Sequence, residues 1–380
     1  MKKSLLVAAI AALSSFGTFA QGYYYHKTTG TNSVEYNPRN STGTTDVILA
    51  EATPKTKTLS AAQTIPFTWN FYGNPITGYK VSSSGYITFN TSMTADSNNN
   101  VALPSPAAPA GAIFAFWDNL KVVFATGVNT TYPQGVRSWT YGTAPNRVHV
   151  VQWQLLQKDD GSANLANITQ FAVRFYEADG GTKFDIVHNF GAGTLNATVG
   201  TQDLMGNATQ VTGSPNLNFG GANGGVNAAT ERVYTFYYGN QVAYDVRLNS
   251  IDVEKFLSPG QASNIGYSFY NNGAQTITSF RVNYSVDGAA PVSQNVTGVS
   301  VAGGNEGQTY ATVHSTPFSS TVASSKKITV WVDNINGANA DLDNSNDTLS
   351  KPNTIVSTTV KRKSLQEVFT SSTCPPCLPG

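Results

Sequence analysis

The chain has 380 residues, of which 40% are hydrophobic and 11% aromatic, so it carries enough apolar material for folded cores and is not globally disordered. Its length allows two or three domains. Only 12% of the residues are charged and the formal net charge is +1; without a domain-sized basic stripe, nucleic acid is excluded as an expected partner.

The first 20 residues have the pattern of a secretory signal peptide. Lys2 and Lys3 form a basic start, an apolar stretch runs from Leu5 to Phe16, and small residues precede a cut at Gln21. The apolar stretch is too short to span a bilayer comfortably, and no other segment is long and apolar enough to cross one. We therefore expect export with cleavage, and a final location in the periplasm, at the cell surface or outside the cell.

Residues 21–239 are expected to form a first β-sandwich of roughly 200 residues. In one run Ile87 and Phe89 lie on one face and Tyr86 and Thr88 on the other, the period of a half-buried strand. The segment 95–110 is rich in Asn, Pro and Ala and is expected to be a loop. Asp179-Gly180-Gly181 is a hairpin turn signal, and we find no helix pattern in this span. Further strands are expected at Ala112–Trp117, Arg147–Leu155, Phe171–Phe175, Phe184–Phe190 and Val233–Tyr238.

Three segments of this first region carry a recognisable pattern. The segments that begin at Ile65, Val81 and Phe116 contain the patterns P-F-x-x-x-F-Y-G, S-x-G-Y-I-x-F and F-W-D-x-L. This pattern resembles nidogen-type extracellular modules and modules in secreted and surface proteins of Bacteroidetes-type bacteria. The resemblance implies an adhesion or ligand-presenting role.

The residues at the end of the 112–117 strand are candidate ligand-facing residues. Asp118 and Asn119 could touch a sugar or a calcium ion, although a turn that ends a strand explains both equally well. An exposed Trp117 ring could stack on a sugar or anchor a protein partner. Most of the large aromatic residues are expected in the core, but not all of Trp69, Tyr72, Trp117, Trp139, Trp153 and Trp331.

Residues 240–350 are expected to form an immunoglobulin-like sandwich. Alternating apolar residues from Phe280 to Val286 run into the turn signal Asp287-Gly288. The cysteine pair that marks many immunoglobulin domains is absent, so the prediction concerns the architecture alone. Other strands are expected at Tyr244–Leu248, Ile265–Phe269 and Ile328–Val332.

Two polar segments of this second region resemble those of the immunoglobulin-like CARDB modules of bacterial surface proteins. They are Asn271-Asn272-Gly273 and residues 341–347, and the resemblance implies spacing or cell adhesion. Asp341, Asp343, Ser345 and Asp347 alternate as in a calcium loop. An EF-hand would require Gly and Glu where Asn346 and Pro352 stand, so a solvated turn is favoured over a cation site.

No enzymatic motif appears before the last residues of the chain. The histidines His26, His149, His188 and His314 do not have the spacing of metal ligands. Neither G-x-S-x-G nor H-E-x-x-H occurs. We therefore expect no metal site and no cofactor.

Residues 351–363 are expected to be a polar linker, followed at 364–380 by the truncated start of a thioredoxin-like domain. A short strand precedes Cys374-Pro375-Pro376-Cys377, the only two cysteines of the chain. In such folds the strand fixes the loop, and the helix after it lowers the thiol pKa. Because the sandwiches contain no cysteine, their stability must come from burial rather than from disulfides.

This last segment resembles the first strand and C-x-x-C motif of thioredoxin-like domains in an outer-membrane-protein-related family of Bacteroidetes-type bacteria. Thr373 departs from that pattern, because an aromatic residue often precedes the first cysteine. The resemblance implies that Cys374 and Cys377 are a catalytic redox pair only if a downstream domain exists, and we expect the chain to be a fragment of a longer protein. The alternatives are a flexible tail with ordinary thiols, or two ligands to a soft metal. The matching residues are Glu367, Phe369, Thr370, Cys374, Cys377, Pro379 and Gly380.

The sequence thus favours an all-β, non-enzymatic, secreted or cell-surface protein. Its two sandwich modules would bind, adhere or space domains, with an unknown protein or glycan as ligand. One alternative is an envelope thiol–disulfide oxidoreductase in the full-length form, and another is a carbohydrate-binding protein. No membrane span is expected.

Overall fold

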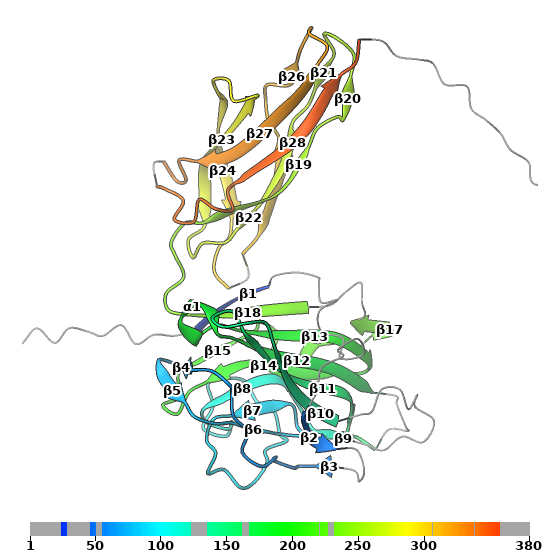
Figure 1. The fold of residues 1–380 in the computed structure, drawn as a ribbon, viewed down its shortest axis with the longest axis vertical. Coiled ribbons are helices and arrows are strands. Elements are labelled where there is room, and N and C mark those ends of the chain that lie inside the picture. The colour runs from blue at the N-terminus through cyan, green and yellow to red at the C-terminus, as the bar shows by residue number, and fades with distance from the viewer. Residues whose placement is uncertain are drawn as a thin grey trace, which may run out of the picture. The chain divides into compact units, whose positions relative to one another are not determined.

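The structure is a computed structural model that describes residues 24–28, 46–50, 55–122, 135–161, 167–219, 221–226, 232–305, 307–337 and 339–357. Over these residues nearly all of the regular secondary structure is β-strand, which confirms the all-β prediction. The chain divides into two compact units between Gln241 and Val242 (Figure 1). The expected signal peptide at residues 1–20 and the expected thioredoxin-like segment at 364–380 lie outside the described residues.

The first unit is a sandwich of two antiparallel sheets. The larger sheet runs in the order β1 (Tyr24–Thr28), β18 (Arg232–Tyr238), β13 (Phe184–Gly193), β12 (Ile168–Tyr176), β11 (Val148–Lys158), β10 (Gly135–Tyr141) and β2 (Asp46–Ala50), with β17 (Gly221–Val226), β3 (Lys55–Thr56) and β9 (Leu120–Val122) paired beside this path. The smaller sheet runs β15 (Ala208–Gln210), β14 (Asn196–Gln202), β8 (Ala112–Trp117), β7 (Tyr86–Thr88) and β6 (Lys80–Val81), with β16 (Leu217–Asn218) beside β14. A separate hairpin joins β4 (Trp69–Phe71) and β5 (Asn74–Ile76).

The core of this unit is an aromatic layer between its sheets. Trp153 of β11 lies opposite Phe171 of β12, and their stacked rings are 4.9 Å apart. Phe116 of β8 stacks on Phe171 at 5.3 Å and so joins the two sheets. Full burial of one such side chain stabilises a fold by about 2 kcal/mol. A layer of these residues can therefore hold the unit together without cross-links.

The smaller sheet is buried on both of its faces. Ile87 of β7 faces the main core, whereas Tyr86 belongs to a second cluster with Phe114 and Trp117. Leu103 of the 95–110 loop covers this second cluster. The prediction of a loop at 95–110 is confirmed. The prediction of a half-buried strand is wrong, because this loop folds over the face that was expected to meet solvent.

The hairpin between β12 and β13 contains the helical turn α1 (Ala178–Gly181). The sequence predicted a tight turn at Asp179-Gly180-Gly181 and no helix. The last two residues of α1, Gly180 and Gly181, both have positive φ, a conformation that glycine adopts without a steric cost.

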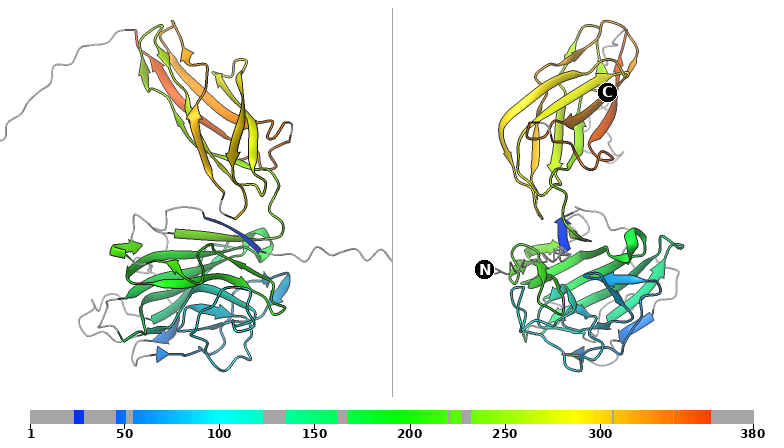
Figure 2. Two further views of the ribbon diagram at one scale, coloured as in Figure 1. Left: turned by 180° about the vertical axis from the view of Figure 1, so that it is seen from behind. Right: turned by 90° about the vertical axis from the view of Figure 1, so that its left-hand side faces the viewer.

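The second unit is a smaller sandwich (Figure 2). One sheet has the order β19 (Val246–Asp252), β22 (Gly266–Asn271) and β25 (Thr309–Val313). The other has the order β20 (Phe256–Leu257), β28 (Thr348–Ile355), β27 (Ser325–Asp333), β23 (Ile277–Val286) and β24 (Val292–Val301), and a short pair joins β21 (Ala262–Ser263) to β26 (Phe318–Ser319). The core between the sheets is built from alternate residues of each strand, such as Phe280 and Val282 of β23.

One boundary of the second unit requires correction. The segment from Lys351 to Ile355 was expected to open a linker, but it belongs to β28 and pairs with β27. Asn353 and Ile355 are buried. The polar composition of the strand conceals its alternation, because only every second side chain faces the core.

Candidate functional site

The three residues predicted to face a ligand in the first unit are engaged in contacts within the protein. Trp117 is 0% exposed, and its Nε1 donates a hydrogen bond to the carbonyl oxygen of Ser97 at 2.7 Å. Asp118 is also buried and lies 2.7 Å from Lys158 Nζ. The Asn119 amide donates to the Asp159 carbonyl at 2.7 Å. These residues tie loops together, and Trp117 offers no ring face to a ligand.

The segment 81–89, which contains the S-x-G-Y pattern, also has a structural role. The fully buried hydroxyls of Ser82 and Ser84 donate to the two carboxylate oxygens of Asp96, at 2.5 and 2.6 Å. Burial, together with the Asp96 charge, raises the pKa of Tyr86 above its ordinary value. This network holds the 95–110 loop against the smaller sheet.

The buried histidines of the first unit are packed among aromatic rings and are neutral at pH 7. His149 hydrogen-bonds the Tyr79 hydroxyl at 2.9 Å, and His188 Nε2 lies 2.7 Å from the Ala115 carbonyl oxygen. Burial lowers the pKa of His26 and His149 to about 4 and that of His188 to about 3. In the described part of the chain, no three His, Cys, Asp or Glu side chains gather in a way that could hold a metal ion.

The acidic segment 341–347 forms a turn whose carboxylates accept hydrogen bonds from the protein itself. The Asp341 carboxylate accepts hydrogen bonds from the backbone N–H of Val246 at 2.6 Å and from that of Asp343 at 2.9 Å. Asp245, also buried, accepts the side-chain amide of Asn272 at 2.6 Å. The turn is therefore satisfied internally, as expected for a structural role.

Asp341 is expected to titrate with a midpoint near pH 6. Burial of the carboxyl group raises its pKa, and the backbone hydrogen bonds lower it. The effect of burial is larger, so the pKa is about 6. Its contribution to stability is therefore complete below its usual pKa and is lost as the pH rises towards 6. A ¹³C NMR titration of the Asp341 carboxyl carbon tests this, with exposed Asp252 as the internal reference. A midpoint below 4 would show that the hydrogen bonds outweigh burial.

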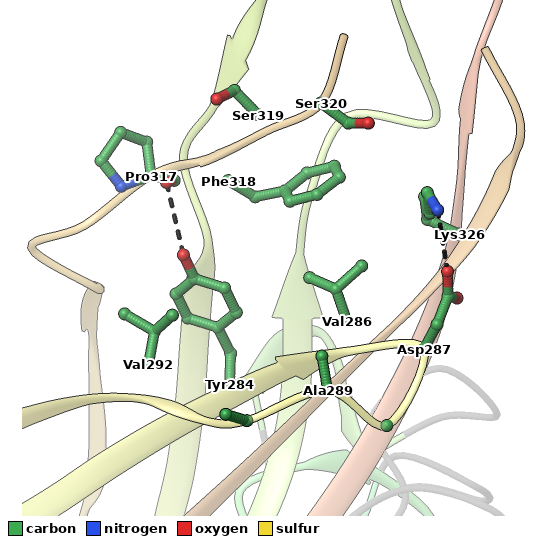
Figure 3. A pocket seen from close by; sticks show the side chains of 12 residues that line it. Tyr284, Val286, Asp287, Ala289, Val292, Pro317, Phe318, Ser319, Ser320 and Lys326 are labelled. Carbon is green, nitrogen blue, oxygen red and sulfur yellow. Dashed lines mark hydrogen bonds and ion pairs between the residues drawn. The ribbon is translucent and has the colours of Figure 1, made fainter. Parts of the chain in front are cut away.

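The second unit contains an open cleft of about 720 Å³, whose lining residues Figure 3 shows. It is bounded by the β23–β24 hairpin and by the segment that leads through β26. Tyr284, Val286, Val292 and Phe318 present apolar side chains to it, while Asp287, Lys326, Ser319 and Ser320 supply the polar rim.

The cleft is held in shape by contacts among the segments that bound it. The Tyr284 hydroxyl donates to the Pro317 carbonyl oxygen at 3.4 Å, and its ring packs edge-on against His314 at 4.9 Å. Asp287 accepts the Lys327 backbone N–H at 2.7 Å and pairs with Lys326 Nζ at 3.0 Å. These bonds hold the pKa of Asp287 below its usual range. The rim pair therefore stays ionised and carries no net charge.

The sequence did not predict this cleft. Its walls come from hairpin residues near 287 and from residues 317–320, which only the fold brings together. The one available signal was the Asp287-Gly288 turn. The structure confirms this turn, with φ angles of 50° and 78°.

The large aromatic residues divide as the sequence predicted, with most of them in the core but not all. Trp69, Trp153 and Tyr72 are buried in the main core, whereas Trp139 and Trp331 are partly exposed on strands β10 and β27. Cys374 and Cys377 lie outside the described residues.

Comparisons place the first unit in a known family. Residues 24–238 match the family model described as NIDO related, whereas no curated protein matches the chain. Among solved structures, the chain is similar to a crystal structure of the CARDB domain of the PF1109 protein from Pyrococcus furiosus in complex with di-metal ions. The sequence identity is 14% and the TM-score is 0.25, and the match covers 31% of this chain and 92% of that chain. A solution NMR structure of the same domain has 18% identity, 30% and 97% coverage and a TM-score of 0.24.

The described part of the chain contains no helix with the length and apolar character needed to cross a membrane. The β-sandwich of residues 24–238 accounts for more than half of the 380 residues. By this match, the chain belongs to the NIDO-related family.

Proposed function

We propose that this chain is an exported, non-enzymatic binding protein that holds a protein partner through the cleft of its second sandwich. The observation that carries the proposal is the cleft itself, with apolar walls and a polar, neutral rim. The signal-peptide pattern of residues 1–20 supports export. The match to the NIDO-related family, and the sequence resemblance of residues 271–273 and 341–347 to CARDB modules, support an adhesion-type role.

The chemistry of the cleft fits an apolar anchor side chain. Protein interfaces concentrate their binding energy where one aromatic or aliphatic residue fills a pocket ringed by polar groups. Phe318 and Val292 supply apolar contact, and Ser319 and Ser320 can hydrogen-bond the backbone beside an anchor. A leucine or tryptophan side chain matches these walls better than a charged one does.

The hydroxyl of Tyr284, the only phenol among the residues that line the cleft, is suited to a structural role rather than to proton transfer. Burial raises the pKa of Tyr284, and its O–H already donates to Pro317. A general base or nucleophile would need a pKa near the working pH. The cleft therefore favours recognition over catalysis.

Small anchor analogues should bind this cleft. We expect indole and N-acetyl-leucine amide to bind the full chain with a dissociation constant of about 1 mM, the value suited to ligands of this size. In ¹H–¹⁵N NMR spectra, the amide signals of Ala289, Ala290, Ser319 and Ser320 should shift.

Filling the cleft should abolish these shifts. Ala290→Trp places an indole at the cleft, whereas the control Ala274→Trp adds the same side chain at an exposed position outside the cleft. Binding should fall at least about tenfold in the first variant and remain unchanged in the second. Equal responses from both variants, or no response from the parent chain, would refute the proposal.

A further inference from the structure

The outer face of the five-stranded sheet in the second unit carries a tryptophan among polar side chains. Trp331 lies at the middle of a row that crosses four strands, from Ser293 through Asn283 and Trp331 to Thr348. Cross-strand partners share a face, and alternate residues of a strand point to opposite faces. Val330 and Val332 therefore enter the core, while Trp331 faces outward and is partly exposed.

An ion pair adjoins the tryptophan. Arg281 and Asp333 lie opposite each other in the next row, and the guanidinium binds the carboxylate through two nitrogens at 2.7 and 2.9 Å. Their side chains are 38% and 34% exposed. Burial raises the pKa of Asp333, but the hydrogen bonds and the positive charge of Arg281 outweigh burial and bring this pKa below its usual range. The carboxylate is thus ionised, fixed and accessible.

The side chains around this centre are uncharged hydrogen-bonding groups. Ser293 donates to the Asn283 side-chain oxygen at 2.6 Å, and Thr329 and Ser350 hydroxyls are 2.9 Å apart. Asn295 continues the row of Arg281. Lys327 of β27 is a second cationic residue on this face. It lies near the start of the strand and is separated from Trp331 by Thr329. The centre of the face therefore has no net charge.

We propose that this face binds a neutral carbohydrate chain, with the Trp331 ring against one sugar and the Arg281–Asp333 pair on neighbouring hydroxyls. A hydroxyl is both donor and acceptor, so two adjacent hydroxyls match a guanidinium beside a carboxylate. An indole supplies the apolar surface on which a sugar ring can stack. The paired charges give an acidic polysaccharide no advantage, and a protein interface would need a wider apolar centre.

This surface is independent of the cleft. The cleft residues Tyr284 and Val286 lie on the inner face of β23, whereas Arg281 and Asn283 lie on its outer face. Loss of one activity should therefore leave the other intact. A glycan array with neutral glucans, mannans and chitooligosaccharides beside alginate and heparin, probed with the full chain, provides the first test.

We expect binding to at least one neutral glycan class and not to alginate or heparin. In a titration with the best neutral oligosaccharide, Trp331→Ala should weaken binding at least about tenfold, whereas Trp331→Phe keeps an aromatic ring and should stay within about threefold. Arg281→Gln should also weaken binding without removing the ring. Trp139→Ala in the first unit and Ala290→Trp in the cleft serve as controls and should bind like the parent.

Several outcomes would overturn this inference. They are a blank array, preferential binding to acidic glycans, and equal affinity of the parent and Trp331→Ala. Circular dichroism establishes that each variant is folded. If Trp331→Ala does not fold, the pair Trp331→Phe and Arg281→Gln decides: full affinity in the arginine variant would count against the site.

Discussion

Lowering the pH from 7 to 5 is expected to destabilise the first sandwich by about 6 kcal/mol, or about 2 kcal/mol for each of three buried histidines. Burial holds the pKa of His26 and His149 at about 4 and that of His188 at about 3, against about 6.5 in an unfolded chain. Below pH 6.5 the unfolded chain binds protons that the folded unit excludes. Stability is therefore lost as the pH falls from 6.5 towards 4.

Denaturant unfolding at pH 7, 6 and 5 measures this effect. Four of the five tryptophans lie in the first unit, so the fluorescence change reports mainly on its unfolding. The variant His188→Phe removes one titrating group. Its phenyl ring is compatible with the surrounding rings of Phe116, Phe171 and Phe219. It should reduce the pH dependence by about one third, because the three histidines contribute similarly in this range. An unfolding free energy that stays constant from pH 7 to pH 5 would contradict the prediction.

The second unit should respond less to the same change of pH. Its one buried histidine, His314, has a pKa lowered by burial and so acts in the same direction as those of the first unit. The raised pKa of Asp341 acts in the opposite direction, because its stabilisation grows as the pH falls from 6. Acid should therefore destabilise the first unit by more than the second.

Gly85→Ala is expected to cost the first sandwich about 4 kcal/mol or more, which is enough to unfold many domains. Gly85 has a φ of +87°, and an added Cβ would lie 2.0 Å from the Phe116 carbonyl oxygen. That oxygen belongs to the backbone of β8, whose Ala115 and Phe116 N–H groups are in turn bound to the Gly85 carbonyl. Neither strand can move away without breaking these bonds.

Gly206→Ala is the matched control. Gly206 has nearly the same φ, +89°, but nothing lies within 4 Å of its added Cβ. The backbone conformation alone costs a non-glycine residue about 1 kcal/mol. Thermal unfolding of both variants therefore separates the steric clash from the conformational cost. Equal losses in the two variants would show that the approach of β8 is not the reason for a glycine at position 85.

Much of the fold follows from local patterns in the sequence. Alternation of apolar side chains predicted strands around residues 147–155, 171–175 and 280–286, and the structure places β11, β12 and β23 there. The Asp287-Gly288 turn follows from the ability of these residues to adopt positive φ. Strands β24 and β28 were not predicted, because their polar residues reduce the contrast between the two faces.

The sequence by itself determined that this protein is built from strands, because a period of two residues and its turn signals are local properties. Only the tertiary structure decided which strand faces meet solvent. Trp117 and Trp331 both lie on strands and are both followed closely by Asp and Asn. A loop covers the first ring, whereas the second remains partly exposed. What covers a face depends on segments distant in sequence, which alternation within one strand cannot encode.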